Sequence, residues 1–349
     1  MRVSERQGTL RLALIVLLTG LLIATAAPAT ARPEDPGRID TGSYTSGVLT
    51  YTYEAFVPDD LPADPALVVM VHGCKTTAEQ QRHANLLDPI ARRDGFVVLY
   101  VDGSPFHLLQ QRCWSGLLTP ALESRTSGDA AAIAAMTRLV IARYHVDADR
   151  VYAVGMSSGA YETTLLGAYF PDLFAAIGVH SGAAFDHGAL GCVGPYLPTV
   201  SPEQLAAQAL SAEGGYRRVM PVIGFHGDAD PAVPYECGRQ VIEQWRQTDN
   251  LLLATQAAPN GIPPQPTGIV DGVANVPEGH SYTVESWKYE SDCPTLQLWT
   301  IHDMAHYWSG GSADPDAAEF TDPRGPNAAQ AAWEFFSPIR RTDTGFRCE

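Results

Sequence analysis

A short glycine-rich segment, Gly155-Met156-Ser157-Ser158-Gly159, constrains the fold of this chain more than any other feature. It follows an apolar run at Val151–Val154 and precedes a helix-forming stretch at Ala160–Tyr169. In that context the G-x-S-x-G pattern predicts a strand that turns sharply into a helix and holds Ser157 on a strained, exposed turn. Glycines suit both ends because side chains there would collide with the neighbouring helix and strand. The segment predicts a serine nucleophile, against the alternative of an ordinary strand–helix turn.

The N-terminal residues have the pattern of an export signal. Three arginines precede an apolar core at Leu12–Ala24, and Ala29-Thr30-Ala31 has the small-x-small pattern of a cleavage site. The alternative is a membrane anchor, but this core is shorter than the ~20 residues that span a bilayer. We therefore expect residues 1–31 to be cleaved and residues 32–349 to form one secreted, extracellular catalytic domain without membrane contact.

Charge and cysteine content limit the partners of the chain. Its net charge of −16 opposes binding to nucleic acid. We expect the protein to be a monomer. An even cysteine count in an exported chain suggests disulfides, and six cysteines allow 15 pairings that the sequence leaves open. Their spacing matches no zinc pattern, so we expect neither a metal nor a cofactor. The cysteines are Cys74, Cys113, Cys192, Cys237, Cys293 and Cys348.

Short apolar runs alternate with helical stretches along the remaining chain. Strands are expected at 47–57, 66–71, 96–101, 151–154, 174–179, 222–225 and 296–301. Helices are expected at 78–93, 129–144, 239–247 and 328–336. This alternation predicts an α/β fold in which helices cover both faces of a mostly parallel, doubly wound sheet. Two excursions interrupt it: residues 183–218, which could form a lid, and the Pro- and Gly-rich residues 256–281, expected to be an irregular surface loop.

Two aspartates compete for the role of the catalytic acid. A serine nucleophile needs a base with a carboxylate behind it, and in sheets of this kind the chain order is Ser, then Asp or Glu, then His. Asp228 and Asp230 both follow the strand at 222–225. Asp230 is favoured because Pro231 and the turn at 233–235 would anchor its backbone, whereas Asp228 suits local backbone contacts. The alternative is a calcium site formed by the two aspartates, but two carboxylates fall short of the ~6–8 oxygen ligands that calcium needs.

Two histidines follow the last expected strand. His302 lies at the strand end and suits a packed or half-buried position, whereas His306 lies on the loop, from which its side chain can reach across the sheet edge to Ser157. The predicted catalytic residues are therefore Ser157, Asp230 and His306.

The tetrahedral oxyanion needs hydrogen-bond donors. One is expected from the backbone N–H of Ser158, the residue after the nucleophile. The second is expected from the N–H of Cys74, because Gly73 lets the loop after 66–71 approach closely. A bridge between Cys74 and Cys113 would hold this loop rigid. Three aromatic residues near these loops are expected to bind substrate, Trp114, Tyr235 and Trp308, although core positions are the alternative, for Trp114 in particular.

Several ordered motifs of this chain resemble the polyhydroxybutyrate depolymerase family of α/β-hydrolase esterases, which also contains feruloyl and acetylxylan esterase relatives. The motifs are Val71-His72-Gly73-Cys74, Arg112-Cys113-Trp114, Gly128-Asp129, the serine segment 155–160, residues 226–230 with 233–235, His306-Tyr307-Trp308-Ser309-Gly310-Gly311, and residues 321–326. The resemblance implies an α/β-hydrolase fold, the same three catalytic residues, and an oxyanion hole formed by the Cys74 and Ser158 amides.

The resemblance leaves several functions open. The main expectation is a secreted serine esterase that hydrolyses polyhydroxyalkanoate-type polyester through an acyl-enzyme. The alternative is a feruloyl or acetylxylan esterase that acts on plant cell-wall polysaccharide, because the same catalytic residues serve both. A peptidase on this fold would need a gating domain that the sequence does not indicate. A more distant alternative is a non-catalytic binding protein, although such proteins often lose the serine or the histidine.

Overall fold

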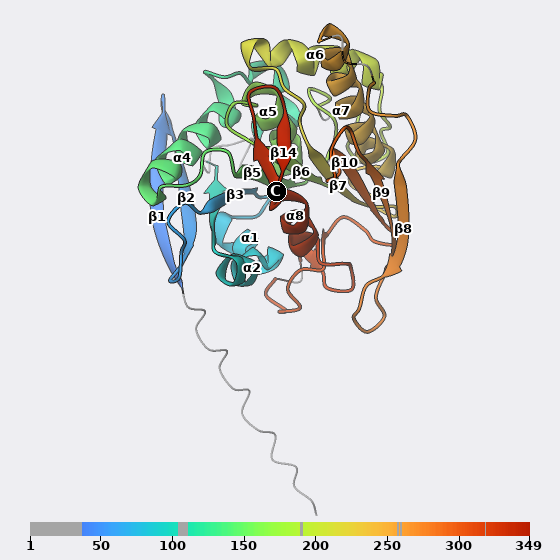
Figure 1. Cartoon of the computed structure of the whole chain (residues 1–349). Helices are drawn as coiled ribbons and strands as arrows, with labels where there is room; N and C mark the ends of the chain where they lie inside the picture. The colour runs from blue at the N-terminus through green and yellow to red at the C-terminus, as the bar shows by residue number, and fades with distance from the viewer. Residues whose placement is uncertain (1–36, 104–110, 189–190, 257, 259, 318) are drawn as a thin grey trace, which may run out of the picture. The chain divides into compact units, whose positions relative to one another are not determined.

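The computed structural model describes residues 37–349, apart from 104–110, 189–190, 257, 259 and 318. The predicted export signal at 1–31 lies outside the described residues. A ten-stranded sheet forms the centre of the described part, in the order β1-β2-β4-β3-β5-β6-β7-β10-β9-β8 (Figure 1).

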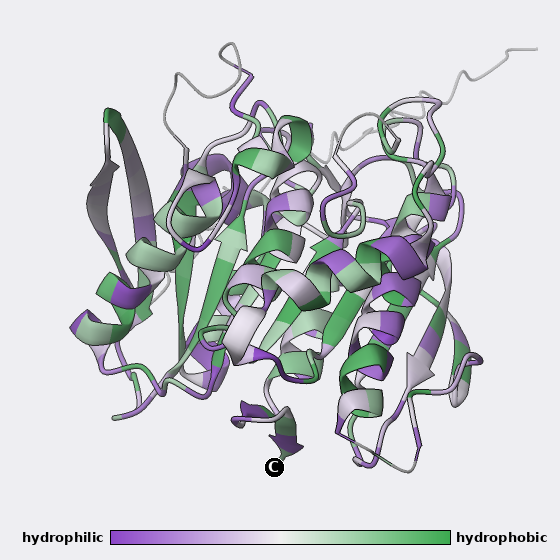
Figure 2. Ribbon diagram, turned by 90° about the horizontal axis from the view of Figure 1, so that it is seen from above, coloured by the Kyte–Doolittle hydropathy of each residue, from purple (hydrophilic) through white to green (hydrophobic). Residues whose placement is uncertain are grey.

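Six neighbouring strands in the middle of this sheet are parallel. They are β4 (Phe96–Asp102), β3 (Ala66–Val71), β5 (Val151–Met156), β6 (Ala176–His180), β7 (Val222–Gly227) and β10 (Leu296–Ile301). Most of their residues are buried, as expected where helices cover both faces of a sheet. Figure 2 shows these strands as a mainly hydrophobic layer, with hydrophilic residues on the outer sides of the helices. The predicted mostly parallel α/β sheet is confirmed.

Antiparallel strands extend the sheet at both edges. β1 (Gly37–Ser46) and β2 (Leu49–Pro58) form a hairpin beside β4, and β9 (Ser281–Trp287) pairs with β10. β8 (Gly268–Val273) pairs with β9, so the expectation of an irregular loop at 256–281 is wrong for this part. The Pro and Gly content hid an edge strand, most of whose side chains are exposed.

Helices cover both faces of the sheet, as predicted. One face carries α4 (Gly128–Tyr144), α5 (Ser158–Tyr169) and α7 (Tyr235–Thr255), and the other carries α1 (Ala78–Asn85), α2 (Leu87–Asp94) and α8 (Ala328–Phe336) (Figure 1). The helix expected at 78–93 is interrupted at Leu86, which has a φ of 64°. The Asn85 side chain accepts a hydrogen bond from the Leu87 N–H at 2.8 Å and so begins the second helix.

Residues 183–218 contain α6 (Pro202–Ala212), which begins with a capping box at Ser201 and Gln204 and packs against α7. The remaining short elements are α3 (Ser115–Leu118), η2 (Pro120–Leu122), η3 (Gly214–Tyr216), and the strand pairs β11 (Trp308–Ser309) with β12 (Thr321–Asp322) and β13 (Ile339–Arg341) with β14 (Phe346–Cys348). No helix within the described ranges has the length and apolar character needed to cross a bilayer.

All six cysteines form disulfides. The pairs are Cys74–Cys113, Cys192–Cys237 and Cys293–Cys348. The first is the bridge considered from the sequence, and it ties the loop after β3 to the segment before α3. The second attaches the 183–218 excursion to the first turn of α7, and the third ties β14 to the segment before β10.

Candidate active site

Ser157 lies at the turn between β5 and α5. Its φ of 54° and ψ of −124° are unusual for a residue with a side chain, and such strain is typical of functional turns. A Cβ atom at Gly155 would collide with the Gly159 carbonyl, and one at Gly159 would collide with the Val71 carbonyl. The turn can therefore be this tight only because both positions are glycine. The Ser157 N–H donates to the His180 carbonyl at 2.9 Å, which anchors the turn to β6.

His306 pairs with a buried carboxyl, that of Asp230, beside this turn. His306 Nδ1 lies 2.7 Å from Asp230 Oδ2, and the Asp230 side chain has no exposed surface. Because an ionised carboxylate only accepts hydrogen bonds, Nδ1 must carry the proton and donate it. The Nε2 atom of the neutral ring is then left as an acceptor. This is the tautomer that a general base requires.

Asp230 is held in place by its own loop. Its Oδ1 accepts hydrogen bonds from the N–H groups of Ala232 at 2.8 Å and Val233 at 2.9 Å. Burial raises the pKa of Asp230, but the His306 hydrogen bond, the charges of His306 and His226 and the Val233 N–H together bring it below its usual value. The carboxyl is therefore ionised at neutral pH and can stabilise a protonated His306.

Two further buried histidines surround this pair, and sequence reasoning gave neither a direct role. His226 Nε2 donates to the Val233 carbonyl at 2.9 Å and lies 3.5 Å from Asp230 Oδ2. His180 stacks on Trp308 and accepts the Ser309 N–H at 3.1 Å, and burial lowers its pKa to about 3. As neutral rings, His226 supports the loop that carries Asp230, and His180 supports the segment after His306.

The competing candidates, Asp228 and His302, pair with each other. His302 Nδ1 lies 2.8 Å from Asp228 Oδ2, and about a third of each side chain is exposed. Asp228 Oδ1 also accepts the Asp303 N–H at 2.7 Å. The structure thus brings Asp230 to His306 and Asp228 to His302, and the half-buried His302 agrees with the packed or half-buried position expected for it.

The loop that carries Cys74 is tied down on several sides. Trp114 Nε1 donates to the His72 carbonyl at 2.8 Å, and the Lys75 N–H donates to the Gln111 carbonyl at 2.7 Å. The Cys74–Cys113 disulfide joins the same two segments. A Cβ atom at Gly73 would lie 3.3 Å from the Ser157 Cβ, so the loop approaches the serine closely.

Ser157 and His306 line one cavity of about 310 Å³. Gly73 and Cys74 lie on its wall. Sequence reasoning missed the other lining residues, which are Lys75, Thr76, Gln81, Met156, Ala232, Glu319 and Phe320. Residues next to a motif, such as Lys75, Met156 and Phe320, could have been found from the sequence, whereas Gln81 comes from a segment without a recognisable signal.

The three predicted substrate contacts lie outside this lining. Trp114 and Trp308 have 1% and 0% of their surface exposed, so they are core residues and the prediction for them is wrong. Trp114 supports the Cys74 loop, and Trp308 supports His180. Tyr235 is half-buried and its hydroxyl lies 2.6 Å from Thr300 Oγ1.

The 183–218 excursion contributes no described residue to the cavity wall. Its Gly194 N–H donates to the Ala232 carbonyl at 2.8 Å, and its Ala183 and Cys192 pack in one apolar cluster with Val233. Within the described ranges, one group of side chains is spaced closely enough for a metal ion, namely Glu123, Asp129 and Glu162. None of the three lines the cavity.

Comparison with solved structures agrees with the α/β-hydrolase fold. Acetyl xylan esterase from Aspergillus awamori superposes with a TM-score of 0.64 at 21% identity, over 85% of this chain and 99% of that one. Poly(aspartic acid) hydrolase-1 from Sphingomonas sp. KT-1 superposes with a TM-score of 0.51 at 14% identity, over 87% of this chain and 99% of that one. At these identities the likeness concerns the fold alone.

Sequence comparison extends to named esterases. Feruloyl esterase B from Neurospora crassa is 34% identical over 218 residues, which cover 58% of this chain and 71% of that protein. Acetylxylan esterase A from Emericella nidulans is 32% identical over 248 residues, which cover 66% of this chain and 79% of that protein. The family model described as esterase PHB depolymerase matches residues 52–263, more than half of the chain. This protein is therefore a carboxylic ester hydrolase that belongs to the esterase PHB depolymerase family.

Proposed function

We propose that this protein is a serine esterase that removes acetyl or feruloyl groups from polysaccharide. In this proposal Ser157 is the nucleophile, His306 the general base and Asp230 the acid that orients it. The observation that carries it is the shared cavity: Ser157 and His306 line the same 310 Å³ space, and Asp230 lies 2.7 Å behind the histidine.

The reaction follows from the tautomer of His306. Nε2 accepts the proton of the Ser157 hydroxyl while Oγ attacks the ester carbonyl carbon. The Cys74 and Ser158 N–H groups would donate to the resulting oxyanion. The tetrahedral intermediate expels the alcohol, which takes the proton from His306, and an acyl-enzyme remains. Water then attacks this ester with His306 again as the base, which releases the acid and regenerates Ser157.

The identity of the acyl donor rests on the relatives. The curated proteins that this chain resembles at about one-third identity are named feruloyl and acetylxylan esterases. These names favour acylated polysaccharide over the polyester substrate expected first from the sequence. The cavity of about 310 Å³ would hold the acyl group, and the alcohol side of the ester would extend out of it.

A substrate panel tests this proposal. Purified protein would be assayed on acetylated xylan, methyl ferulate, amorphous polyhydroxybutyrate and p-nitrophenyl acetate, with Ser157→Ala as the matched control. We expect the polysaccharide or ferulate esters to have the highest kcat/KM and the variant to lose that activity. A higher kcat/KM on polyhydroxybutyrate would overturn the proposed substrate class but would leave the serine esterase mechanism in place.

We also propose that the protein acts outside the cell. Three disulfides that include every cysteine are typical of proteins that fold in an oxidising compartment. Cleavage of the predicted signal near Ala31 can be checked by N-terminal sequencing of protein secreted by its natural host.

A further inference from the structure

Glu162 lies in the second turn of α5, the helix that begins directly after Ser157. Its side chain is completely buried. Oε2 accepts the Gly116 N–H at 2.9 Å, but Oε1 has no hydrogen-bond partner and Glu162 forms no ion pair with a described residue. An ionised carboxylate in this position would leave a buried charge without compensation, which is a large energetic cost.

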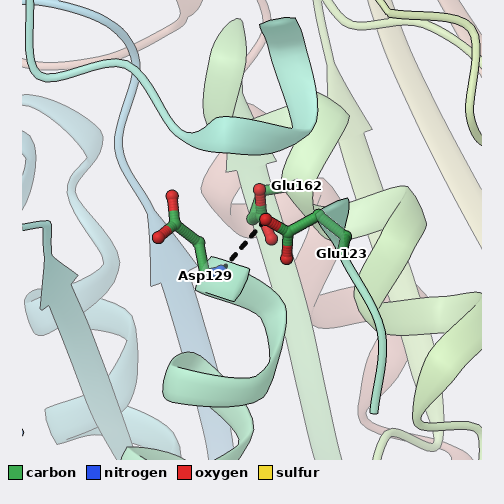
Figure 3. A group of neighbouring side chains, drawn as sticks. All are labelled: Glu123, Asp129 and Glu162. Atoms are coloured by element: carbon green, nitrogen blue, oxygen red, sulfur yellow. Dashed lines mark hydrogen bonds between the residues drawn. The ribbon is translucent and has the colours of Figure 1, made fainter. Parts of the chain in front are cut away.

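Other acidic groups surround Glu162 (Figure 3). One oxygen each of Glu123, Asp129 and Glu162 lie within 4.8 Å of one another. Tyr51 on β2 and Tyr169 at the end of α5 are the other titratable groups that interact with Glu162. Burial, followed by the charges of Glu123 and Asp129, raises the pKa of Glu162 well above its usual range.

A proton fits Glu162 better than a metal ion does. The other two carboxyls are already used as acceptors: Glu123 accepts from Ser115 Oγ and from the Asp129 and Ala130 N–H groups, and Asp129 accepts from Tyr51 and the Ser115 N–H. Only Glu162 Oε1 remains unused among the six carboxyl oxygens. A bound cation needs several oxygens that are free to turn toward one centre. Protonation instead converts the single unused acceptor into a donor that can face the Glu123 carboxylate.

Glu162 also links the two proposed oxyanion donors. The Ser158 amide begins the helix that carries Glu162. The Glu162 carboxyl accepts a hydrogen bond from the Gly116 N–H. Gly116 lies two residues after Trp114, and the Trp114 indole N–H donates to the carbonyl of His72 in the Cys74 loop. The Cys74–Cys113 disulfide closes the same connection. A change at the Glu162 carboxyl would therefore alter the relative position of the Ser158 and Cys74 amides.

We propose that Glu162 is a carboxylic acid that stays protonated at neutral pH, positions the two oxyanion donors relative to each other and sets the alkaline limit of the enzyme. This inference rests on the proposed function, because it uses the proposed oxyanion hole. When Glu162 ionises, it repels Glu123 and Asp129, and the segment that holds the Cys74 loop shifts away from α5.

The stability of Glu162→Gln against pH tests the protonation. The amide is neutral at every pH and can still accept from Gly116 and donate toward Glu123. Because the folded-state pKa of Glu162 is raised, its stabilising contribution is complete below the ordinary value of 4.5 and is lost as the pH rises. We expect the unfolding constant of the wild type, relative to that of E162Q, to increase about tenfold per pH unit above pH 5. A ratio that stays constant from pH 5 to 9 would overturn the proposal.

Glu213→Gln is the matched control for positioning. Glu213 is also fully buried, and burial raises its pKa to about 9, but it does not line the cavity or contact the Cys74 loop. We expect the wild type and E213Q to lose kcat together at alkaline pH, by ~10² if one oxyanion donor is displaced, while E162Q keeps its kcat and all three keep their KM. If E162Q loses kcat in parallel with E213Q, Glu162 has only a structural role.

Two further measurements separate the remaining outcomes. If a chelator destabilises the wild type and Ca²⁺ restores it, a cation occupies the cluster and the proposal fails. If E162Q does not fold, the chemical shift of the Gly116 amide proton in the wild type reports the state of Glu162. That shift should change only at alkaline pH, and a change near the ordinary glutamate value would contradict the proposal. If Ser157→Ala loses activity and E162Q has the same pH profile of kcat as the wild type, the proposal for Glu162 fails but the proposed esterase function stands.

Discussion

Two aspartate–histidine pairs lie side by side at the ends of β7 and β10, and they differ in surroundings rather than in distance. His306 lies 2.7 Å from Asp230, and His302 lies 2.8 Å from Asp228. The Asp230 carboxyl is fully buried and faces two backbone N–H groups and His226. About a third of the Asp228 side chain is exposed, and it caps the turn at Asp303.

This difference shows what makes such a pair useful for catalysis. In water the attraction between a carboxylate and a histidine is weak, and an exposed pair contributes only about 0–1 kcal/mol. In a buried site the same contact fixes the tautomer and stabilises the charge that forms on the ring. Of the two pairs, only Asp230–His306 has a buried carboxyl and a histidine that lines the cavity of Ser157.

The largest expected effect comes from replacing each of the two histidines by alanine in turn. His306→Ala should lower kcat by ~10⁴ or more, because it removes the proposed base, whereas His302→Ala should change kcat by less than about threefold. Steady-state kinetics on p-nitrophenyl acetate would measure both. Equal losses in the two variants would show that burial does not distinguish the pairs.

A smaller effect is expected from the two aspartates. Asp230→Asn should lower kcat by ~10³–10⁴, because an amide can stabilise the wrong tautomer of His306 and carries no charge to oppose that of the protonated ring. Asp228→Asn should leave kcat nearly unchanged. A large loss in D228N with little change in D230N would reverse the assignment of the acid.

The smallest effect concerns stability at low pH. The pKa of Asp230 is lowered in the folded state, so its stabilising contribution is present above the ordinary value of 3.8 and is lost as the pH falls through the folded value. The difference in unfolding free energy between wild type and Asp230→Asn should be constant above about pH 5 and shrink below pH 4, by about 1.4 kcal/mol per unit of pKa shift. Urea titrations at several pH values would measure it, and a difference that grows on acidification would contradict the pKa shift.

The fold could be predicted where burial determines the sequence pattern. The strands at Ala66–Val71 and Leu296–Ile301 and the helix at Ala328–Phe336 match their expected bounds, because continuous apolar or alanine-rich runs allow few alternatives. The interruption at Leu86 was missed although Pro89 lies three residues later, where a proline without an N–H is tolerated in the first turn of a helix but not in its interior. The edge strand β8 was missed because its mostly exposed residues carry no burial pattern.

For the site, chain order and local turns indicated which residues would meet, but not what surrounds them. The positions of Asp230 and His306 follow from where β7 and β10 end. The burial of Trp114 and Trp308 depends on contacts with His72 and His180, which lie more than 40 and 120 residues away. Such contacts between distant segments leave no periodic signal in the sequence.

The most direct test of the central claim is covalent labelling of the nucleophile. The protein would be treated with an organophosphonate ester and digested, and the adduct would be located by mass spectrometry. We expect one adduct per chain, on Ser157, whose formation parallels the loss of esterase activity and slows strongly in His306→Ala. Complete inactivation with the adduct on another residue, or with Ser157 unmodified, would contradict the account.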